Sequence, residues 1–169
     1  LDASGTRMGP DIRETLQAAD GDSMPRLVWT GTEYGLAWLH GFSPLSVKFT
    51  RLSAAGQRIG SETTVSLSGY VERSPLSLVS TGSGFGIACE TVGSGHKEIV
   101  FARLDATGTR IGLETPLTYD SFASRQPSLV WTGAEFGLSW LDDRDGNPEV
   151  YFSRIDPSGM RVGADLRVT

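Results

Sequence analysis

The segment Leu27–Leu39 reads "LVWTGTEYGLAWL", and Leu129–Leu141 repeats it as "LVWTGAEFGLSWL". A more divergent copy, "LVSTGSGFGIACE", spans Leu78–Glu90. Successive copies begin 51 residues apart. Self-similarity at a fixed period of this size is typical of proteins built from repeated structural units, so the chain is divided by this period before strands or helices are assigned.

Other residue types recur at nearly the same interval outside this segment. The period predicts three full repeats, at 16–66, 67–117 and 118–169. Residues 1–15 match residues 155–169, and we predict that they form a surplus N-terminal outer strand. The recurring positions are Arg7, Arg58, Arg110 and Arg161; Phe49, Phe101 and Phe152; and Pro25, Pro75 and Pro127.

Each repeat predicts four β-strands. In the third repeat, "PSLVWTG" and "EFGLSWL" are apolar runs separated by a short turn, which is typical of a hairpin. "PEVYFSRI" is rich in β-branched and aromatic residues, and "RVGADLRV" follows the turn "DPSG". An Asp that opens such a turn and a Gly that closes it favour a type I turn with a left-handed last residue. No stretch has helical periodicity over three turns, so we predict an all-β protein of four-stranded antiparallel sheets.

The second strand of each repeat alternates small and large residues. Gly35 and Ala37 lie on one face of this strand, and Leu36 and Trp38 lie on the other. A strand with one face in water would alternate apolar and polar residues, so we expect this strand to be covered on both faces. Four-stranded sheets that pack face to face in this way are the blades of a β-propeller. Cys89, the only cysteine, replaces the tryptophan in the second repeat and is expected to be a buried apolar residue.

A β-trefoil is the alternative fold, because it also contains three repeats of four strands. Two observations favour propeller blades. Each 51-residue repeat contains two very tight hairpins, and a trefoil has no place for the surplus strand.

The third repeat resembles a known family. The segment "LDDRDGNPEVYFSRID" is similar, from Asp142 to Asp156, to the repeat of TolB-type propellers. In that repeat an acidic turn leads into a strand of the form "xIYxxxxD". The other two repeats keep the strand and lose the acidic turn. The resemblance implies blade architecture, and it implies no function, because one fold carries many functions.

Three blades do not close a propeller, which typically has four to eight. We therefore expect two bare apolar blade faces, and exposed patches of that kind bind a partner or aggregate. The prediction is that the chain self-associates through the open blade faces, or that remaining blades of a longer chain cover them.

The composition excludes some partners. The chain has 169 residues and a net charge of −5, and its arginines are dispersed among acids, which argues against nucleic-acid binding. No apolar run approaches the roughly 20 residues that a membrane helix needs, so we predict no membrane insertion. The expected location of such a soluble propeller is extracellular or in the cell envelope.

The loops that differ between repeats are the candidate binding surface, because a rigid scaffold with variable loops on one face is a common way to position binding residues. These loops are predicted to lie on one rim of the sheets. Unconstrained drift would give the same variability. The candidate ligand-binding residues are His40, Phe42, His96, Lys97, Asp142, Asp143, Arg144, Asp145 and Asn147.

Two charge patterns carry further expectations. Asp143, Asp145 and Asn147 have the alternate spacing of calcium-binding loops, although the EF-hand pattern is excluded because Arg154 stands at its twelfth position. The alternative is a turn in which Asp side chains cap backbone N–H groups. Each repeat also has an acid four residues after its arginine, roughly 13 Å away on an extended strand, so we expect these pairs not to touch.

We predict a non-enzymatic binding or scaffold module that presents its variable loops to a protein partner. The alternatives are a lectin that binds a glycan on its blades or between them, and a fragment of a propeller glycosidase. His40 and His96 fall at non-equivalent loop positions without a nucleophile motif, so no catalytic residue is assigned. No cofactor and no resident metal are expected, apart from the calcium considered above.

Overall fold

A computed structural model describes residues 4–6, 9–11, 21–42, 44–65, 67, 69–93 and 95–169. These residues form strands, turns and loops and contain no helix, which confirms the all-β prediction. Accordingly, no described segment is a helix with the length and apolar character needed to cross a membrane. Most of segment 1–15, the predicted surplus strand, lies outside the described residues.

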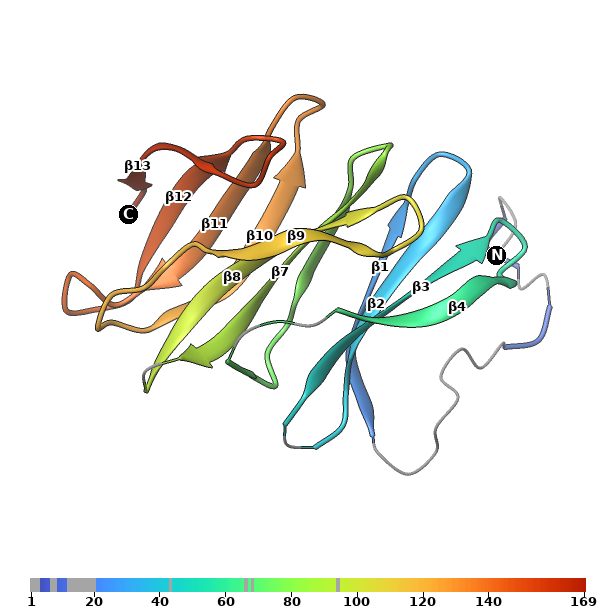
Figure 1. Ribbon diagram of the computed structural model, residues 1–169, viewed down its shortest axis with the longest axis horizontal. Helices are drawn as coiled ribbons and strands as arrows, with labels where there is room; N and C mark the ends of the chain where they lie inside the picture. Colours follow the sequence, from blue (N-terminus) through green and yellow to red (C-terminus); the bar gives the residue numbers. More distant parts are fainter. Residues whose placement is uncertain are drawn as a thin grey trace.

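The described strands form three antiparallel sheets that follow one another along the chain (Figure 1). Within each sheet, neighbouring strands are also consecutive in sequence, apart from an interruption in the middle sheet. Sheet 1 contains β1 (Asp22–Trp29), β2 (Glu33–His40), β3 (Ser46–Ser53) and β4 (Arg58–Val65). Sheet 2 contains β5 (Tyr70–Val71), β6 (Ser77–Ser80), β7 (Gly84–Gly93), β8 (His96–Asp105) and β9 (Arg110–Pro116). Sheet 3 contains β10 (Ser124–Trp131), β11 (Phe136–Asp142), β12 (Glu149–Ile155) and β13 (Arg161–Arg167).

The first strand of every sheet is irregular at the same place. In sheets 1 and 3 the register shifts around Pro25 and Pro127, and the residues before them, Met24 and Gln126, have φ angles of 54° and 55°. In sheet 2 the strand is split, because β5 and β6 pair with different parts of β7. Proline has no N–H to donate to a neighbouring strand, so a bulge or a break at these positions is expected.

The turns between third and fourth strands have the predicted chemistry. Asp105 Oδ1 accepts hydrogen bonds from the backbone N–H groups of Thr107 and Thr109, at 2.8 and 2.9 Å. A hydrogen bond from the Thr107 side chain, together with these backbone bonds, lowers the pKa of Asp105. Gly108 closes the turn with a φ of 87°, in the left-handed region that glycine enters without strain.

The three sheets pack face to face, and a separate hydrophobic core fills each of the two contacts. Both cores combine large residues of one sheet with small residues of its neighbour. The core between sheets 1 and 2 includes Ala37, Val47, Phe49, Phe85, Ile87 and Leu104. The core between sheets 2 and 3 includes Ala88, Ile99, Phe101, Phe136, Leu138 and Trp140.

Glycine in the second strand creates the space into which the next sheet packs. A Cβ atom at Gly35 would lie 2.5 Å from Phe85 Cε1 of sheet 2. The contact repeats one sheet further on, where a Cβ atom at Gly86 would lie 2.7 Å from Phe136 Cε1 of sheet 3. These distances are too short for any side chain, so the alternation of small and large residues is explained by close sheet packing.

The same phenylalanines also pack against an aromatic ring of the preceding sheet. The ring centroids of Phe49 and Phe85 are 4.8 Å apart, and those of Phe101 and Phe136 are 4.9 Å apart. Tilted pairs at this separation add about 0.5–1.5 kcal/mol to the free energy of area burial. The two sheet contacts are therefore copies of one interface.

A polar contact recurs beside these rings. Arg51 Nη1 donates to the carbonyl oxygen of Ala106, at 2.9 Å, and Arg103 Nη1 donates to the carbonyl oxygen of Pro157, at 3.0 Å. In both cases the arginine lies on a third strand, and the acceptor lies in the third turn of the following sheet. This bond links the third strand of one sheet to a turn of the next.

Among the first strands, β6 contacts both β1 and β10. In the described part of the chain, the strand pairings give three separate sheets, with one isolated bridge, Leu45 to Val71, between sheets 1 and 2. A β-trefoil would instead need strands from all three repeats in one barrel. The three predicted repeats, 16–66, 67–117 and 118–169, each enclose one sheet.

The expectation about the arginine–acid pairs is wrong in two repeats. Arg110 Nη1 lies 2.7 Å from Glu114 Oε2, and Arg161 Nη1 lies 3.0 Å from Asp165 Oδ1. The estimate assumed a regular strand, but in β9 and β13 four residues span the length of two partner residues. Gly112, with a φ of 69°, allows this bulge in β9.

Cys89 is buried in the core between sheets 1 and 2, as predicted. Burial, followed by the charges of Glu90 and Glu114, raises the pKa of its thiol to about 12. The reactive thiolate form is therefore strongly disfavoured.

Candidate binding surface on the variable-loop rim

The connections between strands lie on two opposite rims of the stack (Figure 1). One rim carries the nearly identical turns, such as 30–32, 81–83 and 132–135, and we call it the repeated-turn rim. The other carries the loops that differ between repeats, and we call it the variable rim. Among the described residues, its connections are 41–42 and 44–45, 67, 69 and 72–76, 95, 117–123 and 143–148.

The candidates of sheet 1, His40 and Phe42, lie where β2 leaves the sheet. His40 Nδ1 is 2.9 Å from Asp22 Oδ1, which also accepts a 3.0 Å hydrogen bond from Trp38 Nε1. Phe42 is exposed, and its ring lies against Gly21. His40 therefore has a structural partner, whereas most of the Phe42 ring is available to a ligand.

The candidates of sheet 2, His96 and Lys97, begin β8. His96 is exposed, and Lys97 Nζ lies 3.0 Å from Glu72 Oε2 and 3.7 Å from Glu90 Oε2. Glu90 is 3% exposed and accepts hydrogen bonds from the Ser74 hydroxyl and, at 2.7 Å, from the Gln126 N–H of sheet 3. Glu90 thus joins sheets 2 and 3.

Glu90 was not among the predicted residues, although a signal was present. It stands where the other two repeats carry leucine, Leu39 and Leu141. An acid at a core position needs partners, because an unpaired buried charge is costly. The sequence does not reveal that one partner is a backbone N–H of the next repeat.

The third group of candidates follows β11, and Asp142 is its structural centre. Asp142 is completely buried, and its carboxylate accepts hydrogen bonds from Ser124 Oγ at 3.0 Å and from Trp140 Nε1 at 2.8 Å. It also accepts three from Arg144, through the backbone N–H, Nε and Nη2, at 2.7–3.0 Å. With its acceptor positions occupied, Asp142 supports the loop from below and does not itself face a ligand.

The buried indoles explain where these acids occur. Trp140 donates to Asp142 on its own strand, whereas Trp38, at the equivalent position of sheet 1, donates to Asp22 on the neighbouring strand. Sheet 2 has Cys89 there and so needs no acceptor for an indole. A carboxylate accompanies each of these tryptophans because a buried N–H without an acceptor costs about 1–3 kcal/mol.

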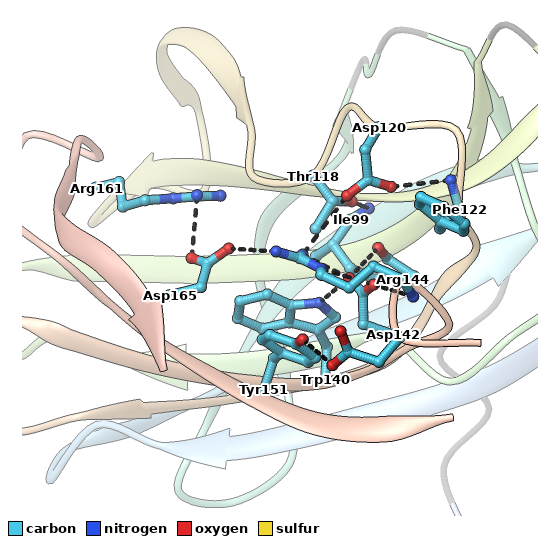
Figure 2. Close-up of polar contacts among 12 residues, drawn as sticks. Ile99, Thr118, Asp120, Phe122, Trp140, Asp142, Arg144, Tyr151, Arg161 and Asp165 are labelled. Carbon is cyan, nitrogen blue, oxygen red and sulfur yellow. Dashed lines mark hydrogen bonds and ion pairs between the residues drawn. The ribbon is translucent and has the colours of Figure 1, made fainter. Parts of the chain in front are cut away.

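Arg144 connects the β11–β12 loop to two other elements (Figure 2). Its Nη1 lies 3.3 Å from Asp165 Oδ2 on β13, and its Nη2 lies 3.7 Å from Asp120 Oδ2 in the β9–β10 loop. The guanidinium carbon is 4.3 Å from the centroid of the Tyr151 ring. The hydrogen bond to Asp142 and the surrounding acids raise the pKa of Arg144, which remains charged.

A cavity of about 190 Å³ opens beside this arginine. It is lined by Leu117, Thr118, Tyr119, Asp120, Arg161 and Asp165 in addition to Arg144. None of these six additional residues was predicted as a ligand-binding candidate. Asp120 lies in a loop that the repeat comparison does mark as variable, but its approach to β13 depends on tertiary packing.

The three residues considered for calcium have other partners. Asp143 accepts two hydrogen bonds from Arg125 Nη2, at 2.6 and 2.7 Å, and Asn147 Nδ2 donates to Glu149. Asp145 Oδ2 is 2.5 Å from the Tyr151 hydroxyl and 3.1 Å from Arg167 Nη1. Within the described ranges, no three His, Cys, Asp or Glu side chains converge as a metal site would require. A calcium ion bound by these three residues would have to displace an arginine from Asp143 and another from Asp145.

Exposed aromatic side chains lie on the variable rim. Tyr119 is 75% exposed and Phe122 is 44% exposed, both in the loop that contains Asp120. Phe122 N–H donates to Asp120 Oδ1 at 2.9 Å, which forms a local turn in this loop. The predicted candidates therefore lie on three separate loops. The structure adds two aromatic residues beside the Arg144 cluster, which consists of Arg144 and the carboxylates of Asp120, Asp142 and Asp165.

The acidic stability of the protein should depend on Asp142. Burial alone would raise its pKa, but hydrogen bonds from Arg144, Trp140 and Ser124 lower it from 3.8 to about 2. Because this pKa is lowered in the folded state, the ionised carboxylate stabilises the fold above pH 4. This stabilisation is lost as the pH falls towards 2. We expect the difference in unfolding free energy between wild type and Asp142→Asn to shrink by about 2 kcal/mol between pH 5 and pH 2. Urea titrations across this range measure it, and a constant difference would contradict the assignment.

The repeated-turn rim contains two equivalent crevices, one at each sheet contact. The crevice between sheets 2 and 3 has a volume of about 270 Å³ and includes Arg103 and Trp131. The crevice between sheets 1 and 2 has a volume of about 260 Å³ and includes Arg51 and Ser80 at the matching positions. Their recurrence follows from the repeated interface.

The sequence matches no family model and no curated protein.

Proposed function

We propose that this protein is a non-enzymatic binding module, built from blades of a β-propeller, that presents its variable rim to a protein partner. The observation that carries the proposal is the exposure of Tyr119 and Phe122 beside the ion-paired Arg144 cluster. Aromatic residues and arginine are enriched at protein–protein contacts, where a few anchors supply most of the affinity. A loop already ordered in the free protein also loses less entropy on binding.

The charges around the cavity support binding rather than catalysis. Asp142 and Asp165 both interact with Arg144, and Asp165 also interacts with Arg161. A general acid has to donate a proton, whereas hydrogen bonds from Arg144, Trp140 and Ser124 lower the pKa of Asp142 to about 2 and occupy its oxygens. Such a cluster fixes loop geometry.

The test removes the aromatic anchors and leaves the scaffold intact. We expect a Tyr119→Ser/Phe122→Ser protein to lose at least tenfold in affinity for any protein that the wild type captures from an extract of its source organism, since two anchors each contribute about 1 kcal/mol or more. The matched control is Leu113→Ser/Met160→Ser, which removes exposed apolar residues away from this rim. Titration of the purified partner against all three proteins measures the effect. Equal affinities for the wild type and the rim variant would overturn the proposal.

A lectin is the second candidate, and the paired crevices of the repeated-turn rim favour it. Trp131 can stack on a sugar ring, with Arg103 as a hydrogen-bond donor beside it. A glycan array separates the two functions. Glycan binding that is lost in Trp131→Ala and retained in Tyr119→Ser/Phe122→Ser would assign the ligand to the crevices.

A further inference from the structure

The three equivalent arginines on the third strands differ in their charge partners. Arg51 Nε lies 3.3 Å from Glu33 Oε1. Arg154 makes two hydrogen bonds to Glu135, at 2.7 and 2.8 Å. Arg103 occupies the same position in sheet 2, but glycine stands there in place of the acid. All three sheets therefore have the arginine, and sheet 2 lacks the carboxylate that balances it.

Gly84 is the residue that replaces this acid. A Cβ atom at Gly84 would collide with the carbonyl oxygen of Leu104, so the backbone conformation admits no side chain here. Two acids in the adjacent turns, Asp105 and Asp156, accept hydrogen bonds within their own turns. Within the described part of the chain, Arg103 forms no ion pair, and only its Nη1 is engaged, in the bond to the third turn of sheet 3. The positive charge of Arg103 is thus left without a protein partner.

The backbone around Arg103 holds its guanidinium in place. Nη1 donates to the carbonyl oxygen of Pro157 at 3.0 Å. A Cβ atom at Gly159 would lie 3.2 Å from Nε, and one at Gly112 would lie 3.9 Å from Nη2. The N–H groups on Nε and Nη2 can still take an acceptor, and the planar fork of a guanidinium matches the two oxygens of a carboxylate. A group positioned in advance also loses less entropy on binding.

Arg103 lines the crevice of about 270 Å³ between sheets 2 and 3. Thr81 and Ser83 add hydroxyl groups to this crevice, and Ile111 and Trp131 add apolar surface. Ligand sites typically combine apolar walls with a few polar groups, and pockets for drug-sized molecules have volumes of roughly 300–1,000 Å³. The crevice therefore suits a smaller molecule that has one charged end.

The equivalent crevice between sheets 1 and 2 lacks both features. Glu33 and Arg51 line it together, so its arginine is already paired. Ser80 stands where the other crevice has Trp131. The comparison of the two crevices therefore indicates one site in each chain.

We propose that the crevice between sheets 2 and 3 binds a small organic carboxylate. The carboxylate accepts hydrogen bonds from Arg103, and the rest of the molecule lies against Trp131. One guanidinium balances one negative charge, so a carboxylate suits the site better than a phosphate monoester such as phosphoserine, which carries about −1.5 to −2 at pH 7. The site lies on the repeated-turn rim, so it goes beyond the proposed contact at the variable rim. It differs from the lectin candidate because the charge of the ligand is required.

Three probes separate the chemistry of the ligand from its source. They are phenylacetate, its uncharged analogue phenylacetamide, and glucuronate, which carries the carboxylate on a sugar. Proton–nitrogen NMR titrations at constant ionic strength follow the Arg103 Nε–H and Trp131 Nε1–H resonances. We expect one molecule of phenylacetate to bind with a Kd of about 1 mM or lower, and phenylacetamide to bind at least tenfold more weakly. Equal affinities for glucuronate and phenylacetate would support the site and identify an acidic sugar as a source of the anion, whereas weaker glucuronate binding would support an apolar carboxylate.

Removal of the arginine charge tests the assignment directly. Arg103→Gln should weaken phenylacetate binding at least tenfold, because a neutral side chain replaces the charged donors. Arg51→Gln is the matched control, since it makes the same change at the equivalent intersheet bond. It should bind phenylacetate like the wild type, because Arg51 is already paired with Glu33.

A second pair of variants leaves the arginine in place, and it decides the test if Arg103→Gln does not fold. Ser83→Glu adds a carboxylate to the crevice at an exposed position, where it can pair with Arg103 and exclude the ligand. It should weaken phenylacetate binding at least tenfold. Thr32→Glu adds the same charge at the equivalent exposed position of the other crevice and should bind like the wild type.

Four results would overturn the proposal. The first is a wild-type chain that binds neither carboxylate at concentrations up to about 10 mM. The second is equal affinity for phenylacetate and phenylacetamide. The third is unchanged affinity in Arg103→Gln or in Ser83→Glu, and the fourth is binding of two equivalent molecules per chain. None of these results involves Tyr119 or Phe122, so the proposed function of the variable rim fails or succeeds separately.

Discussion

Replacement of Gly86 by valine should lower the free energy of unfolding by about 3 kcal/mol, the upper end of typical overpacking costs. On an open sheet, valine would stabilise the strand relative to glycine. Here its Cβ would lie 2.7 Å from Phe136 Cε1 and 3.1 Å from Phe101 Cε2. Both rings belong to the core between sheets 2 and 3, so neither can move without opening it. Urea unfolding measures the loss, and the melting temperature should fall by roughly 6–12 °C.

Gly137→Val is the matched control for this prediction. Gly137 occupies the same strand position in sheet 3, and a Cβ there would meet Val130 Cγ1 at 3.1 Å and Phe152 Cε2 at 3.2 Å. Both contacts are with side chains of the same sheet, on a face that no described sheet covers. The cost should stay below about 1 kcal/mol, because small shifts relieve contacts of this length. Equal losses would contradict the role assigned to Gly86.

Replacement of Asp142 by alanine should cost about 3 kcal/mol, because removal of one partner from a buried ion pair leaves the other groups uncompensated. The buried Trp140 indole and the Ser124 hydroxyl lose their acceptor, and Arg144 loses its closest carboxylate. The β11–β12 and β9–β10 loops should become more mobile as well, since Arg144 joins them. Chemical unfolding gives the stability, and amide hydrogen exchange gives the mobility of the two loops.

Asp143→Ala is the control, one residue further along the chain. Asp143 pairs with Arg125, but both side chains are about one-third exposed, at 30% and 32%. Exposed ion pairs contribute about 0–1 kcal/mol, so the loss should be small. A loss at Asp143 as large as that at Asp142 would show that burial of the carboxylate does not determine the cost.

Part of the candidate surface was accessible from sequence because the repeats can be compared with one another. The comparison separates variable loops from repeated turns, and it selected Asp142 and Arg144, which the structure brings together. It could not identify their roles. Asp142 supports the loop from within, whereas the exposed aromatic groups beside it are Tyr119 and Phe122, which the comparison of repeats does not single out. Exposure depends on which neighbouring elements cover a loop, and that information is not local.

The arginine–acid pairs show how local geometry can mislead. Arg161 and Asp165 were expected to be too far apart on a regular strand, yet they form an ion pair. The glycine between them is the sequence signal for a bulge. In the structure this residue, Gly163, has a positive φ of 79°. Such a glycine permits a bulge, but the bulge forms only where the pairing with β12 requires it.

The sequence by itself determined the repeat, the strand content and the small-and-large alternation of the second strand. Each of these depends on residues close together in the chain or on a period, and side-chain size and backbone preference act at that range. Only the tertiary structure decided which ring fills each glycine position, which acid accepts each buried indole and which apolar faces remain open. Those outcomes depend on contacts between residues about 50 positions apart, and the free energy of such contacts is set by the packing of whole sheets against one another.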